Sequence, residues 1–396
     1  MRIYFYRYNS IFEPDCIDVF KKYGIDVYEE KVEITKKNLT QAERIDLVVK
    51  RLLDAADAGD PFMFVFSINF YPAISDVCNK FHIPYACWSV DCPVTELFAK
   101  QIENEYNRVF LFDRTQYNRI VKYNPDGVFY LPLATNVNRL DRTIATINAM
   151  DRMKYSADIS FVGSLYSEKN PLKSMSLTEK TRGYIDGLEA AQLNVYGYNF
   201  IEESLTDEIV REIKGSDLSD YAGTMVEPLD YYAAAHSFIG YELAERERIK
   251  TLNMLSQDFN VDLYTRSDTT LLPKVHFKGA ANSLTEMPKI FNLSKINLNI
   301  TMRPIQTGLP LRIFDVCGSG GFLMTNYQAE IPEIYEPGVD LETYSSLDEL
   351  HDKCAYYLAH EEERQRIARS GYEKTKAKHT VEIRIHDMIA KMIGDL

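Results

Sequence analysis

One strand–loop–helix–strand stretch constrains the fold more than any other part of the chain. An apolar strand at 296–300 leads into a loop with Gly308 and Pro310, and a short amphipathic helix follows. The helix ends in the run Gly-Ser-Gly-Gly at 318–321, and a second strand occupies 322–325. Two strands joined through a helix form the repeating unit of a parallel sheet. Because the loop after a strand lines the ligand crevice and a helix start favours phosphate, we predict an α/β fold with a site for a phosphorylated ligand.

The same alternation of strands and helices runs through the first 130 residues. The predicted strands are 2–7, 24–28, 62–67, 85–90 and 108–112, and the predicted helices are 12–23, 41–58 and 72–81. The polar stretch 136–156 is interpreted as a connection between two domains, and a second sheet is expected to begin at 159–162. We therefore expect an N-terminal domain at 1–150 and a C-terminal domain at 151–379, the latter with a mostly helical insertion at about 170–250.

The stretch from 307 to 321 resembles the donor-binding motif of the retaining GT-B glycosyltransferases of the group 1/family 4 class. Gly308 and Leu311 match that motif, Asp315 stands for its second glutamate and Gly320 for its closing glycine. Thr307 takes the place of the first glutamate, and a threonine supplies no carboxylate. This departure is similar to the spore-maturation (CgeB-like) branch of the class.

Other segments match the same class in the expected order. The sequence around Gly163, Ser164 and Lys169 resembles the strand and loop that open the donor domain, with Ser164 in place of a phosphate-binding arginine. The segment 275–279 resembles the strand whose closing glycine, here Gly279, touches the nucleotide. Further resemblance is found at 131–135, 330–338 and 361–379.

The resemblance implies a GT-B fold, with two Rossmann-like domains facing across a cleft and a C-terminal helix at 380–396 that returns to the first domain. It implies a hexosyltransferase that moves a sugar, with retention, from a nucleotide diphosphate sugar to an acceptor hydroxyl. A UDP-sugar is the expected donor, as co-substrate and not as a cofactor. The implied donor-binding residues are Gly163, Ser164, Lys169, Gly279, Thr307, Gly308, Leu309, Pro310, Leu311, Arg312 and Asp315. Among them Lys169 would stabilise the leaving diphosphate, with help from Arg312, and Asp315 would hold the ribose hydroxyls.

The first domain is expected to bind the acceptor, a sugar, a protein or another hydroxyl compound. The segment 88–93 follows a predicted strand, where sites in α/β sheets lie. Asp91 is predicted to be a catalytic or acceptor-contacting carboxylate, and Trp88 to stack on a sugar or a base. A similar Trp-x-x-Asp-x-Pro occurs in the CgeB-like enzymes. The alternative is a core tryptophan beside an aspartate that caps a turn.

Composition excludes several classes of function. The net charge is −13 and no basic block occurs, so no nucleic-acid partner is expected. No apolar run is long enough to span a bilayer, and the N-terminus is typical of a strand and not of a signal peptide, so a cytoplasmic location is expected. The six cysteines include no Cys-x-x-Cys pair and should be reduced. Because no Asp-x-Asp pair occurs either, we predict a metal-independent donor site.

Four alternatives remain open at this stage. The replacements at Thr307 and Ser164 also fit a catalytically silent GT-B scaffold that binds a nucleotide sugar or a protein partner. A sugar epimerase built from two Rossmann-like domains is a further option, although its acid–base residues have no counterpart here. The glycine run 318–321 is by itself equally typical of a helix C-cap, and the 170–250 insertion of a structural helical layer. The sequence leaves the sugar, the acceptor and the oligomeric state undetermined.

Overall fold

The computed structural model describes residues 1–214 and 224–393. The chain forms two compact units, and each of them is described by itself. The first unit contains Met1–Leu133, residues 224–228 and the last helix. The second unit contains residues 134–214 and 229–380.

The first unit is built on a six-stranded parallel sheet with the order β2-β1-β3-β4-β5-β6. From β1 the chain adds β2 at one side, and from β3 onward it adds strands at the other side. The strand order therefore reverses between β1 and β3, which makes this pair the topological switch point. Strands β3 and β4 are buried along their whole length, as expected for a parallel sheet covered on both faces. The strands are β1 (Arg2–Tyr6), β2 (Asp26–Glu30), β3 (Val65–Ile68), β4 (Tyr85–Trp88), β5 (Asn107–Leu111) and β6 (Val128–Tyr130).

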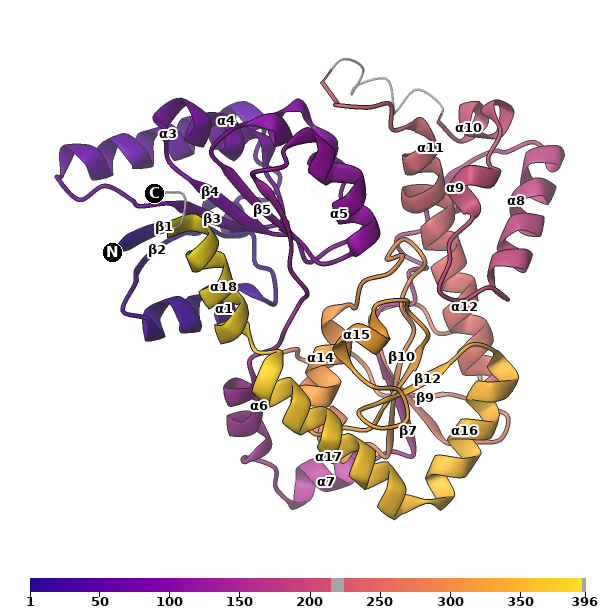
Figure 1. Ribbon diagram of the computed structural model, residues 1–396. Helices are drawn as coiled ribbons and strands as arrows, with labels where there is room; N and C mark the ends of the chain where they lie inside the picture. Colours follow the sequence, from indigo (N-terminus) through magenta and orange to yellow (C-terminus); the bar gives the residue numbers. More distant parts are fainter. Residues whose placement is uncertain (215–223, 394–396) are drawn as a thin grey trace. The chain divides into compact units, whose positions relative to one another are not determined.

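Helices cover both faces of this sheet, with α3 and α4 on one face and α1 and α18 on the other (Figure 1). Helix α3 begins with a capping box in which Thr40 and Glu43 bond to each other's backbone N–H groups. The helices are α1 (Glu13–Lys22), α2 (Val32–Thr35), α3 (Gln41–Asp57), α4 (Pro72–Phe81), η1 (Thr95–Phe98), η2 (Lys100–Glu103), α5 (Arg114–Ile120), η3 (Val121–Tyr123) and α18 (Val381–Ile393). The C-terminal helix therefore belongs to the first unit, as the resemblance implied.

The second unit is built on another six-stranded parallel sheet, with the order β12-β11-β10-β7-β8-β9. Its first and fourth strands along the chain, β7 and β10, are neighbours, so this order is that of a dinucleotide-binding fold with its switch point between them. The strands are β7 (Ile159–Val162), β8 (Val261–Tyr264), β9 (His276–Phe277), β10 (Ile296–Asn299), β11 (Leu323–Asn326) and β12 (Glu342–Tyr344).

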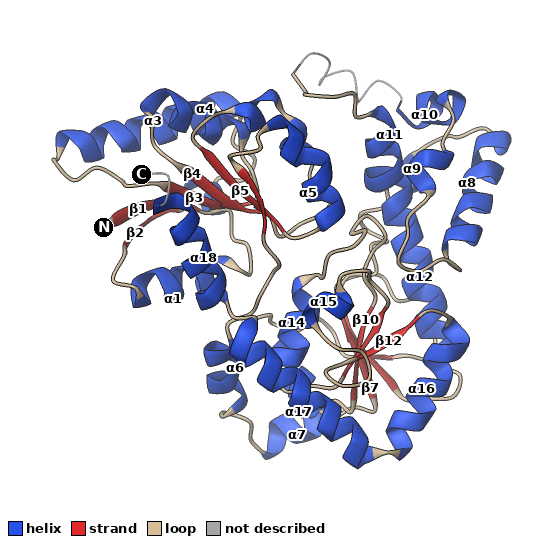
Figure 2. Cartoon of the chain, in the orientation of Figure 1, coloured by secondary structure: helices blue, strands red, loops and turns tan. Residues whose placement is uncertain are grey.

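The second sheet also has helices on both sides, with α14 on one side and α12 and α16 on the other (Figure 2). The helices that come after β9 in this unit are α13 (Met287–Leu293), α14 (Leu311–Gly318), α15 (Ile331–Ile334), α16 (Leu347–Ala359) and α17 (Glu361–Lys378). The glycine run at 318–321 ends α14 and provides close packing. A Cβ on Gly318 would lie 2.6 Å from Cγ2 of Thr135, and Gly320 has a positive φ of 69°. The alternative of a helix C-cap is therefore confirmed for these glycines.

The expected insertion is a helical bundle with a core of its own. Its elements are η4 (Pro171–Ser174), α8 (Glu179–Gln192), α9 (Ile201–Ser204), α10 (Asp207–Lys214), α11 (Asp230–Tyr232), the π-helical η6 (Ala233–Ile239) and α12 (Gly240–Leu255). Helix α12 belongs to two cores, because Leu243 packs in the bundle while Leu252 and Leu255 pack under the sheet. The residues between them therefore lie where the bundle joins the sheet.

The two units meet in the chain at Leu133, earlier than the predicted boundary at 150. The polar stretch 136–156 is not a free connection, since it forms α6 (Val137–Ile144) and α7 (Ala149–Tyr155). Both helices pack against α13 of the second unit. Val137, Leu140 and Tyr155 are buried there, and this burial was hidden by the many charged residues around them.

A short segment at 224–228 interrupts the second unit in sequence but belongs to the first. The backbone N–H of Lys100 donates to the carbonyl oxygen of Thr224, and that of Val226 donates to the carbonyl oxygen of Phe98. The Glu227 carboxylate pairs with Arg119 at 2.7 Å. The region 170–250 is thus not entirely an insertion in one domain.

All six cysteines are free and buried, in agreement with the prediction that they are reduced. Among the residues that the structure describes, no helix combines the length and the apolar character needed to cross a bilayer.

Candidate active site

The switch point of the second unit lies between β7 and β10, and ligands of such sheets bind at the carboxyl ends of the strands there. The loop after β7 contains Gly163, Ser164 and Lys169, and the loop after β10 contains Thr307 and Gly308. These two predicted donor segments are therefore brought to the same edge of the sheet, although more than 130 residues separate them in the chain.

Helix α14 starts from this edge. Pro310 is its N-cap residue, and no side chain caps the first turn. The first N–H groups of an uncapped helix have no intrahelical partner, and the helix dipole adds a partial positive charge there. Gly308 and Leu309 are buried and Thr307 and Leu311 are half-buried, so the predicted segment forms the entrance to the helix.

The loop after β7 is held in an unusual conformation. Tyr166 has a φ of 66°, which is uncommon for an aromatic residue and costs free energy. The Ser164 hydroxyl donates to the Glu168 carboxylate at 2.7 Å and accepts from the Tyr166 N–H at 2.7 Å. Ser164 is thus engaged in fixing the loop, and its side chain does not supply the missing positive charge.

Arg248 of α12 lies at the centre of this edge, and the sequence had not identified it. Its Nη1 donates to the carbonyl oxygen of Ser164 at 2.5 Å, just after β7. Its Nη2 donates to the carbonyl oxygen of Ile300 at 2.7 Å, just after β10. The guanidinium lies over the ring of Tyr166, with 4.4 Å from Cζ to the ring centroid. The run Glu245–Lys250 alternates in charge like an ordinary solvated helix, so no sequence signal distinguished this arginine.

Arg312 is the second guanidinium at this edge and was predicted to contact the donor. Burial lowers the pKa of Arg312, the Asp315 carboxylate opposes that shift, and the charge of Arg248 lowers the pKa further. The positive charge of Arg248 therefore adds to that of Arg312 at this edge of the sheet. Within residues 1–214 and 224–393, neither guanidinium has a carboxylate oxygen within 4.0 Å.

Lys169 completes the positive charge. It is exposed, and its Nζ lies 5.6 Å from the centroid of the Tyr166 ring, the same ring that Arg248 covers. Gly279 is placed differently. It follows the edge strand β9, and its carbonyl oxygen accepts from Thr265 after β8, two strands from the switch point.

Asp315 lies on α14 and already has a protein partner. The hydroxyl of Thr135 donates to its Oδ1 at 2.7 Å, inside the second unit. Asp315 is half-buried and Thr135 is fully buried. The role of Asp315 as a ribose ligand stays a prediction. One of its carboxylate oxygens also binds Thr135, near the start of the second unit.

The first unit has its own cluster at the switch point between β1 and β3. Asn69 follows β3 with a positive φ of 61° and donates through Nδ2 to Asp91 Oδ2 at 2.6 Å and to the Tyr8 hydroxyl at 3.0 Å. Its Oδ1 accepts from the N–H of Val90 at 3.0 Å. Asp91 is exposed, so Asn69 holds an accessible carboxylate in one orientation.

Trp88 does not have the predicted stacking role. It belongs to the middle strand β4, is fully buried and packs edge to face on Phe12 with ring centroids 4.9 Å apart. A side chain without exposed surface offers no face to a sugar or a base. The alternative of a core tryptophan, which the sequence left open, is the one that the fold realises.

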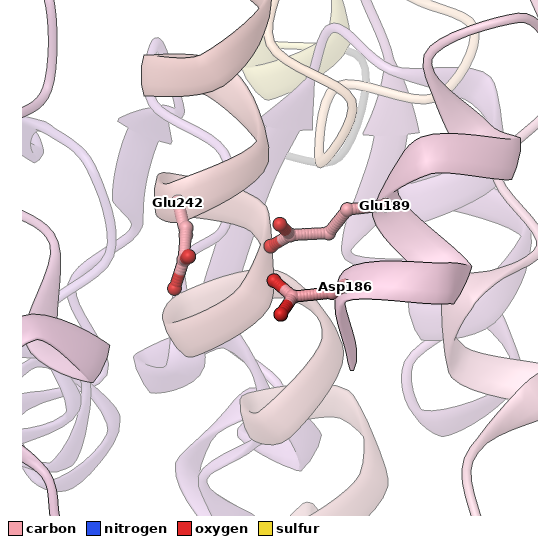
Figure 3. A group of neighbouring side chains, drawn as sticks. All are labelled: Asp186, Glu189 and Glu242. Atoms are coloured by element: carbon pink, nitrogen blue, oxygen red, sulfur yellow. The ribbon is translucent and has the colours of Figure 1, made fainter. Parts of the chain in front are cut away.

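Three carboxylates that lie close enough to hold a metal ion gather in the helical bundle, Asp186 and Glu189 on α8 and Glu242 on α12 (Figure 3). Two arginines are already paired with them. Arg246 lies 2.6 Å from Asp186 and 2.8 Å from Glu189, and Arg182 lies 2.6 Å from Glu242. Because guanidiniums occupy the positions that a cation would take, we assign this cluster to the packing of α8 on α12.

Comparison with known proteins relates this geometry to a chemistry. Residues 246–390 match the model of a family described as glycosyl transferase-like. A comparison with curated protein sequences found no match.

Several solved structures share the whole architecture at low identity. HepE of Anabaena, in complex with UDP and glucose, is 10% identical, with a TM-score of 0.57 over 100% of both chains. Sucrose-phosphate synthase from Thermosynechococcus elongatus is 11% identical, with a TM-score of 0.53 over 100% of both chains. WaaG, a glycosyltransferase involved in lipopolysaccharide biosynthesis, is 10% identical, with a TM-score of 0.51 over 98% of both chains. The chain thus has the GT-B fold, as predicted, and its residues 246–390 are similar to a glycosyl transferase-like family.

Proposed function

We propose that this protein transfers a hexosyl group from a UDP-sugar to a hydroxyl group of an acceptor, with retention and without a metal ion. The observation that carries the proposal is the positive charge at the switch point of the second unit. Arg248, Arg312 and Lys169 gather there beside the uncapped start of α14. A diphosphate is the ligand that such a site recognises, because it needs several cationic partners and accepts hydrogen bonds from backbone N–H groups.

The same charge serves the chemical step. The bond between the anomeric carbon and the diphosphate oxygen breaks, and the diphosphate departs with the electron pair. A bond forms from the anomeric carbon to the acceptor oxygen, whose proton passes to a base. Groups that stabilise the departing charge lower the barrier, and we assign this role to Lys169, Arg312 and the start of α14. Asp91, held by Asn69 in the first unit, is the candidate for the base.

Solved structures of the same fold favour UDP as the nucleotide of the donor. HepE is bound to UDP and glucose in one structure and to UDP-glucose in another. The match of residues 246–390 to a glycosyl transferase-like family favours transfer over epimerisation. The assignment to the spore-maturation branch rests on the residues around Asp315 and on the Trp-x-x-Asp-x-Pro at 88–93, and is part of the proposal.

The replacements at Thr307 and Ser164 left open a silent scaffold. The cationic site argues against it, because two guanidiniums without a carboxylate partner in the described part of the chain are stabilised by an anionic ligand.

Incubation of the purified protein with a panel of nucleotide sugars tests the proposal. We expect release of UDP from one UDP-sugar, faster with an acceptor, and a rise in melting temperature with UDP. At about 100 times Kd, a ligand adds ~2.7 kcal/mol to the free energy of unfolding. Absence of both a thermal shift and nucleotide release for every nucleotide sugar would contradict the proposed function.

A further inference from the structure

We propose that Arg248 of the helical bundle binds the diphosphate of the donor, in place of the arginine that is absent at Ser164. The inference rests on the proposed function and names the residue that restores its missing charge. It also gives the bundle a part in donor binding.

The first argument is position. Arg248 contacts the carbonyl oxygens of Ser164 and Ile300, the residues that leave β7 and β10. A Cβ built on Gly163 would lie 3.9 Å from Arg248 Nη1. The guanidinium of Arg248 therefore lies beside the backbone of the very loop in which the related motif carries its arginine.

The second argument is unused hydrogen-bonding capacity. A guanidinium has five N–H donors, and the two hydrogen bonds to carbonyl oxygens leave three of the five within the described part of the chain. Its Nε is buried and has no partner. Buried donors of this kind are normally satisfied, so an unsatisfied one at the switch point is available to a ligand.

The third argument is charge. The neighbouring carboxylate of Glu247 is taken by Arg303 at 2.8 Å, so it does not pair with Arg248. Arg312 brings a second positive charge, and its pKa is lowered chiefly by burial and further by the charge of Arg248. An anion that binds at this edge of the sheet would stabilise both positive charges, and the diphosphate is such an anion.

The ring of Tyr166 fixes the direction of this charge. Arg248 lies over its face at 4.4 Å and Lys169 at 5.6 Å, so the strained loop after β7 aligns both cations. Because Arg248 lies between the two cores that α12 joins, its position depends on the bundle. The insertion at 170–250 is therefore more than a structural layer.

Calorimetric titration with UDP, UMP and uridine tests the inference. For Arg248→Met we expect UDP affinity to fall tenfold or more and uridine affinity to change less than threefold, with UMP between them. Lys250→Met removes an exposed positive charge two residues further along α12 and is the matched control, with unchanged affinities. Arg248→Lys keeps the charge without the fork and should bind UDP more tightly than Arg248→Met.

Arg248 also holds two strand ends through its hydrogen bonds, so Arg248→Met could weaken binding by disturbing the fold. A second variant distinguishes this effect from the loss of a diphosphate ligand. Adding Ser164→Arg to Arg248→Met returns an arginine to the related motif and should recover at least part of the UDP affinity. Wild-type UDP affinity in Arg248→Met would overturn the inference and leave the proposed function standing. Equal losses for UDP and uridine, without recovery by Ser164→Arg, would assign Arg248 to bracing alone and also overturn it. Failure of the wild-type protein to bind any nucleoside diphosphate would instead overturn the proposed function.

Discussion

The contact between Thr135 and Asp315 allows the ribose-binding role of Asp315 to be separated from its structural role. The Thr135 hydroxyl donates to Asp315 Oδ1 at 2.7 Å in a half-buried place. Thr135→Val removes this hydrogen bond and leaves the carboxylate in place. Asp315→Ala removes the hydrogen bond together with the carboxylate that we predict to hold the ribose.

Both variants should lower stability, but only Asp315→Ala should strongly weaken binding. A hydrogen bond to a charged group contributes roughly 1.5–3 kcal/mol, so Thr135→Val should lower the free energy of unfolding by about that amount and Asp315→Ala by at least as much. Loss of a charge-assisted bond to a ribose hydroxyl carries a similar cost, and ~1.4 kcal/mol corresponds to tenfold in affinity. Asp315→Ala should therefore bind UDP about tenfold or more weakly, whereas Thr135→Val should stay within about threefold of the wild type.

Chemical denaturation and calorimetry measure the two quantities, with 2′-deoxy-UDP as a second ligand. If Asp315 accepts from the 2′-hydroxyl, the wild-type protein should prefer UDP over 2′-deoxy-UDP, and Asp315→Ala should lose that preference. Wild-type UDP affinity in a folded Asp315→Ala protein would refute the reasoning. So would an equal fall in UDP affinity for both variants, because Asp315 would then act only through its bond to Thr135.

Three further predictions concern other parts of the molecule. Asn69→Ala releases Asp91 and Tyr8, so acceptor-dependent kcat/KM should fall about tenfold or more while UDP affinity stays the same; a parallel loss of UDP affinity would contradict a role in acceptor chemistry. Activity should persist in EDTA, because side-chain cations and helix dipoles replace a metal ion; complete loss that manganese restores would refute metal independence. Burial raises the pKa of Glu189 to about 8 from 4.5, so the native state holds a proton that the unfolded state has released between these values, and the free energy of unfolding falls as pH rises through that window. Glu189→Gln removes this titration and should therefore become more stable relative to the wild type from pH 5 to pH 9 in thermal melts; a constant difference would show that Glu189 is ionised throughout.

Local signals in the sequence were sufficient for the individual elements. The helix α4 was predicted at 72–81 and is observed as Pro72–Phe81, because a proline fits the first turn and His82 ends the helix in a left-handed conformation. The predicted strands agree with β1, β3, β4 and β5 to within a few residues. Such signals act over one or two turns and do not depend on the rest of the fold.

The same local patterns were insufficient where burial comes from distant parts of the chain. Trp88 could be a stacking residue or a core residue, because the sequence at the end of a strand does not show whether that strand lies at the edge of a sheet or in its middle. The position of β4 between β3 and β5 buries Trp88 in the core. The stretch 136–156 looked polar, yet its few apolar residues pack on α13, a helix that lies more than 130 residues further along.

The candidate site also has a part that the sequence predicted and a part that only the tertiary structure revealed. By itself the sequence determined the α/β class, the two parallel sheets and the loop–helix segment from Thr307 to Asp315, because these follow from hydrophobic period, glycine and proline positions and one motif. Only the tertiary structure decided that Arg248 lies beside Ser164, since the order of strands in the second sheet makes β7 and β10 neighbours and α12 crosses their ends. A charge supplied from another element is invisible to a linear motif, because electrostatic attraction depends on distance in space and not on separation along the chain.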